Sequence, residues 1–360
     1  MVSRKEAEAC VAAFKLVRVN HPALATVDEQ VTAAIREKAS AAHLLVYGAP
    51  GVGKSTMLRQ IVARFTAEAA PGTVPVVRVE ARVGDNGVFS RIDYYRQVLG
   101  QLGEHVVAKQ VLVNVQDTKG RNRSRTEVDW LDLRDGMEAA LQRLQVRAVI
   151  IDEAQLLMKV DKAQQLLDQL DWLKSMTNVT EVLHVLGGNY DLLDFRNLSG
   201  QAARRGRDVH FARYHYTDAE ERTAFLGAVN YLLEHLGVPC EQEEILRHWF
   251  LLYERSIGCI GNVKDWLVEA LAAALATPGG RVTWPLVEQS APTVARSWSM
   301  GSEAASGEQR LVKSATKISD LRAVLGMPAD PPPDPSLGAG NDATKPKRGR
   351  GRPRKTADGS

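Results

Sequence analysis

The chain has 360 residues, of which 44% are hydrophobic and 25% charged, and its formal net charge is +3. This composition is ordinary for a globular protein with two or three domains. Its three cysteines form no CxxC pair, its eight histidines form no HExxH motif, and no run of 18 apolar residues occurs. These patterns argue against a disulfide framework, a zinc site and a membrane span. We therefore expect a cytoplasmic protein without a signal peptide.

The first part of the chain predicts an α/β domain preceded by helices. Residues 1–40 have an amphipathic, mostly helical pattern. Short apolar runs typical of buried strands then alternate with helix-length stretches, at 43–47, 74–80, 147–151, 181–187 and 208–214. Near-continuous hydrophobicity is typical of parallel strands that are covered on both faces. Residues 41–215 are therefore predicted to form a parallel five-stranded sheet flanked by helices.

A phosphate-binding loop is predicted directly after the first strand. "GAPGVGKS" follows "HLLVY", precedes the helical run "TMLRQIVARF" and matches the Walker A pattern G-x-x-x-x-G-K-[ST]. In this pattern backbone N–H groups surround the phosphates, Lys54 reaches the β- and γ-phosphates, and Ser55 ligates Mg²⁺. A glycine-rich turn without a ligand is the alternative. The predicted ATP contacts are Gly48, Ala49, Pro50, Gly51, Val52, Gly53, Lys54, Ser55 and Thr56.

The third predicted strand supplies a complementary acidic pair. "RAVIIDEAQ" ends an apolar strand in Asp152, which is predicted to hold Mg²⁺, and continues with Glu153. Glu153 is placed to activate a water molecule for in-line attack on the γ-phosphate. A strand that ends in a solvated acidic turn is the alternative, and the Walker A loop upstream argues against it. The two motifs together predict an ATPase.

Polar residues at the last two predicted strands are further site candidates. In "LHVLGGNYDLLDF", Asn189 follows the strand, where it either contacts the γ-phosphate or the attacking water, or caps the next helix. "LSGQAARRGRDVHFARY" places arginines before the last strand, and we favour Arg204 or Arg205 as the residue that reaches a neighbouring subunit's nucleotide. A solvated basic turn is the alternative for these arginines.

A basic segment interrupts the predicted α/β domain. "DTKGRNRSRTE" places four bases at alternate positions, namely Lys119, Arg121, Arg123 and Arg125. In an extended segment, alternate residues share one face, so these bases would form a row that contacts DNA phosphates. A flexible charged loop fits the composition equally well.

The pattern becomes entirely helical from Thr217. "TDAEERTAFLGAVNYLLEHLG" is expected to begin with a capping box formed by Thr217 and Glu220. Further helical patterns cover 241–257 and 262–276. Residues 216–290 are therefore predicted to form a small helical lid on the α/β domain.

The C-terminal part carries a basic motif on a linker. Residues 291–344 are interpreted as a partly helical extension, with one helix at 308–327, and a Pro- and Gly-rich linker. "KPKRGRGRPRK" at 345–355 contains seven basic residues and no acidic one, and its Arg-Gly-Arg-Pro core resembles an AT-hook. Arginines spaced in this way fit a narrow A·T minor groove, whereas a generic polycation or a transport address is the alternative. The predicted DNA contacts are Arg348, Arg350, Gly351, Arg352, Pro353 and Arg354.

Together these motifs resemble those of AAA+ ATPases over roughly residues 40–280. Within that class the chain looks most like the TnsC/TniB transposition regulators, which are relatives of IstB and MuB. The narrower resemblance rests on "QLDWLKSMTNVTEVLHVLGGNYDLLDFRNLSGQAARRGRDVHF", on "VPVVRVE" followed by "YYRQVLGQLG", and on "IIDEAQLL".

The resemblance implies a function and partners. Members of that family assemble with ATP and Mg²⁺ along double-stranded DNA as homo-oligomers, mark a target site and recruit or activate a transposase, and hydrolysis clears the assembly. It implies a ring or helical filament, a slow DNA-stimulated ATPase, a possible target-selector protein and a place at the bacterial nucleoid rather than a membrane. One departure is that "SIGCIGNVKDW" resembles the lid segment that carries a sensor arginine, yet offers only Lys264. A replication initiator or helicase loader, and a nucleotide-gated scaffold with little turnover, are the alternatives.

Overall fold

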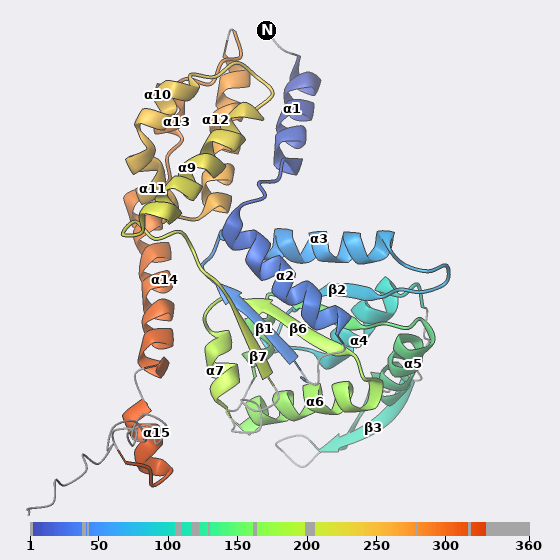
Figure 1. The fold of residues 1–360 in the computed structure, drawn as a ribbon. Helices are drawn as coiled ribbons and strands as arrows, with labels where there is room; N and C mark the ends of the chain where they lie inside the picture. Colours follow the sequence, from blue (N-terminus) through green and yellow to red (C-terminus); the bar gives the residue numbers. More distant parts are fainter. Residues whose placement is uncertain are drawn as a thin grey trace, which may run out of the picture. The chain divides into compact units, whose positions relative to one another are not determined.

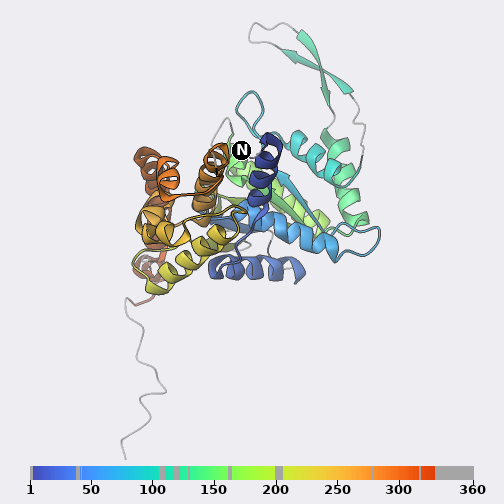
Figure 2. The ribbon, with the colours of Figure 1, turned by 90° about the horizontal axis from the view of Figure 1, so that it is seen from above.

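The computed structural model describes residues 3–37, 41, 43–104, 110–116, 122–128, 130–160, 164–198, 206–277, 279–315 and 318–328. The chain divides into two compact units, Met1–Glu308 and Gln309–Ser360. The first unit contains a parallel sheet with its helices, a helical bundle and a separate β-hairpin (Figures 1 and 2). In the described part of the chain, no helix is both long and apolar enough to cross a membrane.

Five parallel strands form the central sheet in the order β2-β5-β6-β1-β7. The predicted parallel five-stranded sheet is thus confirmed, with strand ends shifted by a few residues. The strands are β1 (His43–Gly48), β2 (Val76–Glu80), β5 (Ala148–Asp152), β6 (Leu183–Gly188) and β7 (Gly206–Phe211). The central strands β1, β5 and β6 are buried along their whole length, which explains their continuous apolar sequences, whereas the edge strand β7 exposes Arg207 and Asp208.

The register of the sheet brings the carboxyl ends of its strands to one edge. Gly48 at the end of β1 pairs with Phe211 at the end of β7, and Tyr47 pairs with Gly188 at the end of β6. On the other side of β6, Asp152 ends β5 opposite Glu80 of β2. The loop after β1, the acidic pair after β5 and the residue after β6 therefore emerge side by side.

Helices cover the sheet on both faces. In Figure 1, α2 and α3 lie above the sheet and α6 lies below it. The helices of this layer system are α2 (Pro22–Arg36), α3 (Lys54–Ala67), α4 (Arg91–Gln101), α5 (Trp130–Arg143), α6 (Gln164–Thr180) and α7 (Leu192–Asn197), with the 3₁₀ helix η1 (Ala154–Met158). Buried aromatic residues lock α4 to α6: Trp172 donates its indole N–H to the Tyr95 hydroxyl at 2.8 Å and packs edge-on against Tyr94.

The helices after the sheet form a bundle around their own core. They are α9 (Ala219–Glu234), α10 (Gln242–Arg247), α11 (Trp249–Ser256), α12 (Ile260–Ala276) and α13 (Trp284–Gln289). The first helix of the chain, α1 (Arg4–Leu16), joins this bundle through Phe14, which is buried with Phe225 and Trp266 in one apolar cluster. The predicted helical lead-in is thus present but divided, since α1 packs on α12 and α2 packs on β7.

The predicted capping box at Thr217 is wrong. Helix α9 begins after Asp218, whose carboxylate accepts the backbone N–H groups of Glu220 and Glu221 at 2.8 and 3.1 Å. Asp and Thr are both good N-caps, and a carboxylate accepts these bonds with a full charge at the positive end of the helix dipole. The helix therefore starts one residue later than the sequence pattern suggested.

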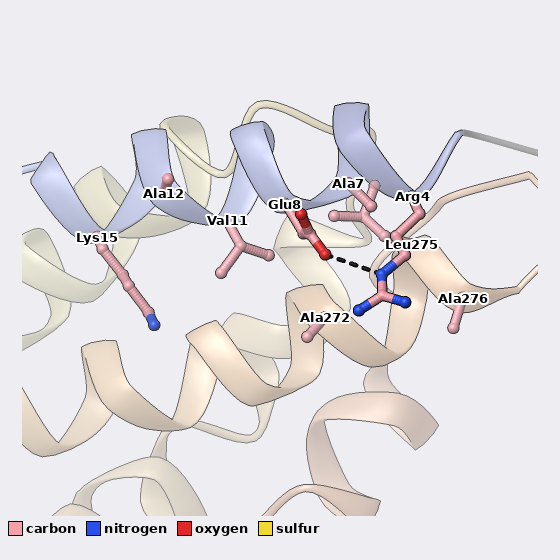
Figure 3. A pocket seen from close by; sticks show the side chains of 9 residues that line it. All are labelled: Arg4, Ala7, Glu8, Val11, Ala12, Lys15, Ala272, Leu275 and Ala276. Atoms are coloured by element: carbon pink, nitrogen blue, oxygen red, sulfur yellow. Dashed lines mark hydrogen bonds and ion pairs between the residues drawn. The ribbon is translucent and has the colours of Figure 1, made fainter.

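A groove of about 610 Å³ runs between α1 and α12 (Figure 3). Small side chains leave it open, including Ala7, Ala12 and Ala272, and the ion pair between Arg4 and Glu8 lies at one end. The groove lies at the C-terminal end of α12, whereas the start of that helix contacts the loop after β1.

The basic segment contains a β-hairpin that was not predicted as such. Strands β3 (Gln110–Gln116) and β4 (Asn122–Val128) pair antiparallel in a sheet of their own, which projects beyond the helices in Figure 2. Arg123 and Arg125 occupy alternate positions of β4, opposite Val115 and Val113. The other two bases of the predicted row, Lys119 and Arg121, lie outside the described residues.

The helix predicted at 308–327 is wrong in its bounds. A 22-residue helix, α14 (Val294–Ala315), starts earlier, and α15 (Ile318–Val324) follows as a separate short helix. The start of α14 contains several Ser and Gly residues, which are weaker helix formers than Ala, but small residues let that helix approach its neighbours closely. Tertiary packing therefore decides where this helix begins.

Candidate nucleotide-binding site

The loop after β1 has the conformation of a phosphate-binding loop. Gly53 directly precedes α3 with φ of +113°, a backbone conformation that other residues rarely adopt. Gly48 approaches the neighbouring strand so closely that a Cβ atom there would lie 2.1 Å from the carbonyl oxygen of Phe211. The glycines thus allow a tight turn that delivers the N-terminus of a 14-residue helix to the carboxyl edge of the sheet.

Lys54 lies inside this loop and is partly buried. Its ammonium donates to the carbonyl oxygens of Gly48 and Ala49, each at 2.8 Å. Burial lowers the pKa of Lys54 to about 8, while nearby groups, including the carboxylates of Glu153 and Asp152, act in the opposite direction. The ammonium is therefore a poorly solvated charge that an anion would stabilise.

Asp152 is the buried centre of the acidic side of the site. One carboxylate oxygen accepts from the Ser55 hydroxyl and from the backbone N–H of Glu153, both at 3.1 Å. The other forms an ion pair at 2.5 Å with Arg78, which projects from β2. The predicted Mg²⁺ ligands Ser55 and Asp152 are thus brought into direct contact by the fold, although 97 residues separate them.

Glu153 and Asn189 are linked through Gln155. Glu153 has a left-handed conformation with φ of +52°, which is uncommon for a non-glycine residue and occurs often at functional sites. The Gln155 amide donates to Glu153 at 2.7 Å, and its carbonyl oxygen accepts the Asn189 backbone N–H at 3.3 Å. Glu153, the predicted water-activating acid, and Asn189, the candidate contact of the γ-phosphate, therefore belong to one hydrogen-bonded chain.

The side chain of Asn189 forms a turn before α7 but does not cap that helix, whose N-cap residue is Asp191. Its carbonyl oxygen accepts the backbone N–H of Asp191 at 3.1 Å, which forms a turn just before α7. Its amide group donates to the carboxylates of Asp191 and Glu303 at 3.2 and 3.3 Å. Asn189 thus shapes the turn without capping the helix, and its contact with a γ-phosphate or an attacking water stays a prediction.

The bundle closes over the phosphate-binding loop through the start of α12. The backbone N–H of Gly261 donates to the carbonyl oxygen of Gly51 at 2.9 Å, and the Asn262 amide donates to that of Pro50 at 3.4 Å. A Cβ atom on Gly261 would lie 2.4 Å from the Gly51 oxygen, so only glycine fits this contact. The lid and the loop are therefore in direct backbone contact.

Residues 36–195 match the family model described as an AAA domain. The fold is that of an AAA+ P-loop NTPase. Two solved structures are similar: the Aeropyrum pernix ORC2 protein (ADPNP–ADP complexes), at 16% identity and a TM-score of 0.51, and the Aeropyrum pernix ORC1 protein in complex with DNA, at 18% and 0.54. The matches cover 75% and 78% of this chain and 66% and 67% of those chains, so this chain spans about two thirds of their length. Among curated proteins, no sequence matches the chain.

The comparisons confirm the AAA+ resemblance at the level of the fold. The narrower resemblance to transposition regulators stays a prediction. Several predicted site residues also lie outside the described part of the chain, so their placement stays a prediction too. These are Arg204 and Arg205, and all six predicted contacts of the C-terminal tail, Arg348, Arg350, Gly351, Arg352, Pro353 and Arg354.

In this structure Lys264 does not face the AAA+ site. Its ammonium donates to the carbonyl oxygens of Lys15 and Val17, at 2.6 and 2.7 Å. Carbonyl groups at the C-terminal end of a helix have no partner within the helix and carry its negative dipole, so Lys264 stabilises the end of α1. The lid segment that resembles a sensor motif therefore contributes Asn262, rather than a base, to the phosphate-binding loop.

Sequence reasoning missed Arg78 and Gln155. Arg78 is the one basic residue in the strand "VVRVE", and a charge in a strand that is otherwise apolar is a usable signal that a buried acid lies beside it. Gln155 follows the acidic pair by two residues, and no pattern in the sequence shows that its amide turns back to Glu153.

Proposed function

We propose that this protein binds ATP with Mg²⁺ and hydrolyses it to ADP and phosphate. The observation that supports this most strongly is the contact between Ser55 and Asp152 beside the partly buried ammonium of Lys54. A hydroxyl and a carboxylate in contact at a helix N-terminus fit a magnesium–phosphate complex. The glycine-rich turn supplies backbone N–H groups for the phosphates.

The residues of the site would share the binding of a triphosphate. The ammonium of Lys54 would exchange its two carbonyl partners for phosphate oxygens. Ser55 and Asp152 would hold Mg²⁺, which when bound neutralises charge on the β- and γ-phosphates. Asp152 is held ready by the guanidinium of Arg78, since that ion pair and two further hydrogen bonds fix both of its oxygens.

Glu153 would act as the general base. It is exposed, directly follows the buried Asp152, and its carboxylate can take a proton from a water molecule as that water attacks the γ-phosphate. Gln155 occupies one of its oxygens through a hydrogen bond of 2.7 Å. In this proposal the second carboxylate oxygen of Glu153 takes the proton, while Gln155 holds the first.

Nucleotide binding and phosphate release from purified protein test this function. Lys54→Ala should abolish ATP binding, whereas Glu153→Gln should keep binding and abolish turnover. Wild-type protein that neither binds ATP nor releases phosphate with Mg²⁺ present would refute the proposal.

We further propose that the ATPase is a DNA-binding regulator of transposition that oligomerises on double-stranded DNA. The resemblance of its motifs to TnsC/TniB regulators supports this, and so does the place of Arg123 and Arg125 at alternate positions of strand β4. Arginines at alternate positions of a projecting β-hairpin suit phosphate contacts on a duplex. In this proposal Arg204 or Arg205 reaches the nucleotide of the next subunit, and the AT-hook-like tail tethers the protein to A·T-rich DNA.

Electron microscopy with an ATP analogue and duplex DNA tests assembly, and a strand-transfer assay with a candidate transposase tests the regulator role. A replication initiator or helicase loader is the second candidate, since the Aeropyrum pernix ORC1 protein in complex with DNA shares the fold. Stimulation of transposition would support the first, and loading of a replicative helicase the second. Absence of ATP-dependent assembly on DNA would contradict both.

A further inference from the structure

Helix α14 extends away from the bundle (Figure 1), and its residues Glu303 and Gly307 contact Asn189 and Tyr190 just after β6. Ala304 of this helix is fully buried. Gly307 touches the ring of Tyr190 so closely that a Cβ atom there would lie 2.1 Å from the ring. Tyr190 directly follows Asn189 and is 3% exposed, and its hydroxyl is bonded to His210 at 2.9 Å, so the ring has little room to move away.

Two carboxylates of α14 bind polar groups at the same place. Glu303 accepts from the Asn189 amide at 3.3 Å. Glu308 binds the guanidinium of Arg213, which follows β7, in a bidentate pair at 2.8 and 3.0 Å. Arg213 also donates to the carbonyl oxygen of Ile257, at the end of α11.

The same helix is attached to the bundle at its start. The hydroxyl of Ser297 donates to the carbonyl oxygen of Arg255 at 2.9 Å, and Gly301 lies beside Ile257. Residues 297–308 of α14 therefore connect the helical bundle to the carboxyl edge of the sheet. This segment is called the strap below.

A short chain of hydrogen bonds links the strap to the proposed general base. Glu303 binds the side chain of Asn189, the backbone N–H of Asn189 binds Gln155, and Gln155 binds the carboxylate of Glu153. The carboxylate of Glu303 is also among the charges that act on Lys54. The strap is thus linked by hydrogen bonds to the proposed general base, Glu153.

We propose that the strap inhibits the ATPase, and that ATP and the strap compete for the side-chain amide of Asn189. Glu303 occupies one of the two amide N–H donors of Asn189, which could otherwise bind a γ-phosphate, and it adds a negative charge where a triphosphate brings more. Binding of ATP therefore displaces Glu303 and loosens residues 303–308, and release of the strap raises the affinity for ATP. This inference rests on the proposed ATPase function and assigns its regulation.

Two glycines of the strap provide a matched pair of variants. Gly307→Ala forces a methyl group into the Tyr190 ring, whereas Gly301→Ala places one at 3.5 Å from Ile257, an ordinary contact distance. Both changes give the same gain in helix propensity, so any difference reports the contact with Tyr190. Glu303→Gln is a nearly isosteric third variant on an exposed side chain, which removes the charge without disturbing packing.

The assay measures KM for ATP and basal phosphate release at saturating Mg²⁺. Relative to Gly301→Ala, we expect Gly307→Ala and Glu303→Gln to lower KM or raise turnover by about fivefold or more, the lower end of the usual coupling between sites. Equal kinetics in all three variants would refute the proposal that the strap inhibits the ATPase. Weaker ATP binding by Gly307→Ala would refute it too, because α14 would then stabilise the site.

Hydrogen exchange of wild-type protein separates this inference from the proposed function. With a slowly hydrolysed ATP analogue and Mg²⁺, amides of the loop 49–55 should become protected while those of residues 303–308 exchange faster. Protection of the loop without faster exchange in the strap would refute inhibition by the strap and leave the proposed ATPase function standing. No protection of the loop would refute nucleotide binding itself, and with it the strap.

Discussion

Replacing Arg78 by alanine should lower the folding stability of the nucleotide-free protein and yet improve its binding of Mg²⁺. The change leaves Asp152 as a carboxylate whose side chain is only 3% exposed, without the ion pair that now neutralises it. Removing one partner of a buried ion pair costs about 3–5 kcal/mol. Arg78 is 24% exposed, and Asp152 keeps its bonds to Ser55 and to the Glu153 backbone, so we expect a smaller loss, about 2 kcal/mol.

A loss of this size should be visible in thermal unfolding. It corresponds to a fall in Tm of roughly 4–8 °C for a domain of about this size. Arg4→Ala is the control, because the Arg4–Glu8 pair has side chains 93% and 66% exposed. Exposed pairs contribute about 0–1 kcal/mol, so the control should change Tm little.

The second measurement is the Mg²⁺ concentration that gives half-maximal ATP binding. Because Asp152 is no longer neutralised by a fixed cation, Arg78→Ala should need less Mg²⁺ than the wild type. The reasoning would be refuted by an unchanged Tm, since Arg78 would then not stabilise Asp152. A higher Mg²⁺ requirement would contradict it in another way, since Arg78 would then help to bind the metal complex.

Three further predictions concern Lys54 and the DNA contacts. Lys54→Ala should abolish ATP-dependent DNA binding in a gel-shift assay, and full retention would disprove the nucleotide gate. Because burial lowers the pKa of Lys54 to about 8, the unfolded chain binds more protons than the folded one between pH 8 and 10.5. The folding stability of the wild type should therefore rise with pH in this window, by up to about 3 kcal/mol relative to the Lys54→Met variant. Parallel curves of stability against pH for the two proteins would contradict a lowered pKa of Lys54. Removal of residues 341–360 should flatten the salt dependence of DNA binding by about 0.9 log unit per lost phosphate contact, and an identical slope would exclude the tail as a DNA contact.

Features that depend on neighbouring residues could be predicted from the sequence. The five strands follow from continuous apolar runs, and the turn after β1 follows from glycines whose conformation few other residues adopt. The contact of Ser55 with Asp152 was also expected, although it spans 97 residues, because each belongs to a motif whose chemistry requires the other.

Contacts between distant residues without such a motif could not be predicted. Arg78 is 74 residues from Asp152, and Glu303 is 114 residues from Asn189. The single charge in an otherwise apolar strand marks Arg78 as the partner of a buried acid without saying which one, and nothing local marks Glu303, since both contacts depend on strand order and on how α14 packs. The sequence pattern placed a helix at 308–327, whereas Ala304 and Gly307 lie inside α14, where Ala304 is buried and Gly307 lies against the Tyr190 ring.

The central claim is that Glu153 drives ATP hydrolysis at this site, and a single-turnover assay tests it most directly. Wild type, Glu153→Gln and Glu181→Gln are mixed with labelled ATP and Mg²⁺, and bound ATP and released phosphate are followed together. Glu181 is a matched control, because it is exposed, has φ of +56° and precedes β6 at the opposite end from the site. The account predicts full ATP binding in all three and loss of phosphate release in Glu153→Gln alone, whereas undiminished release by Glu153→Gln would contradict it.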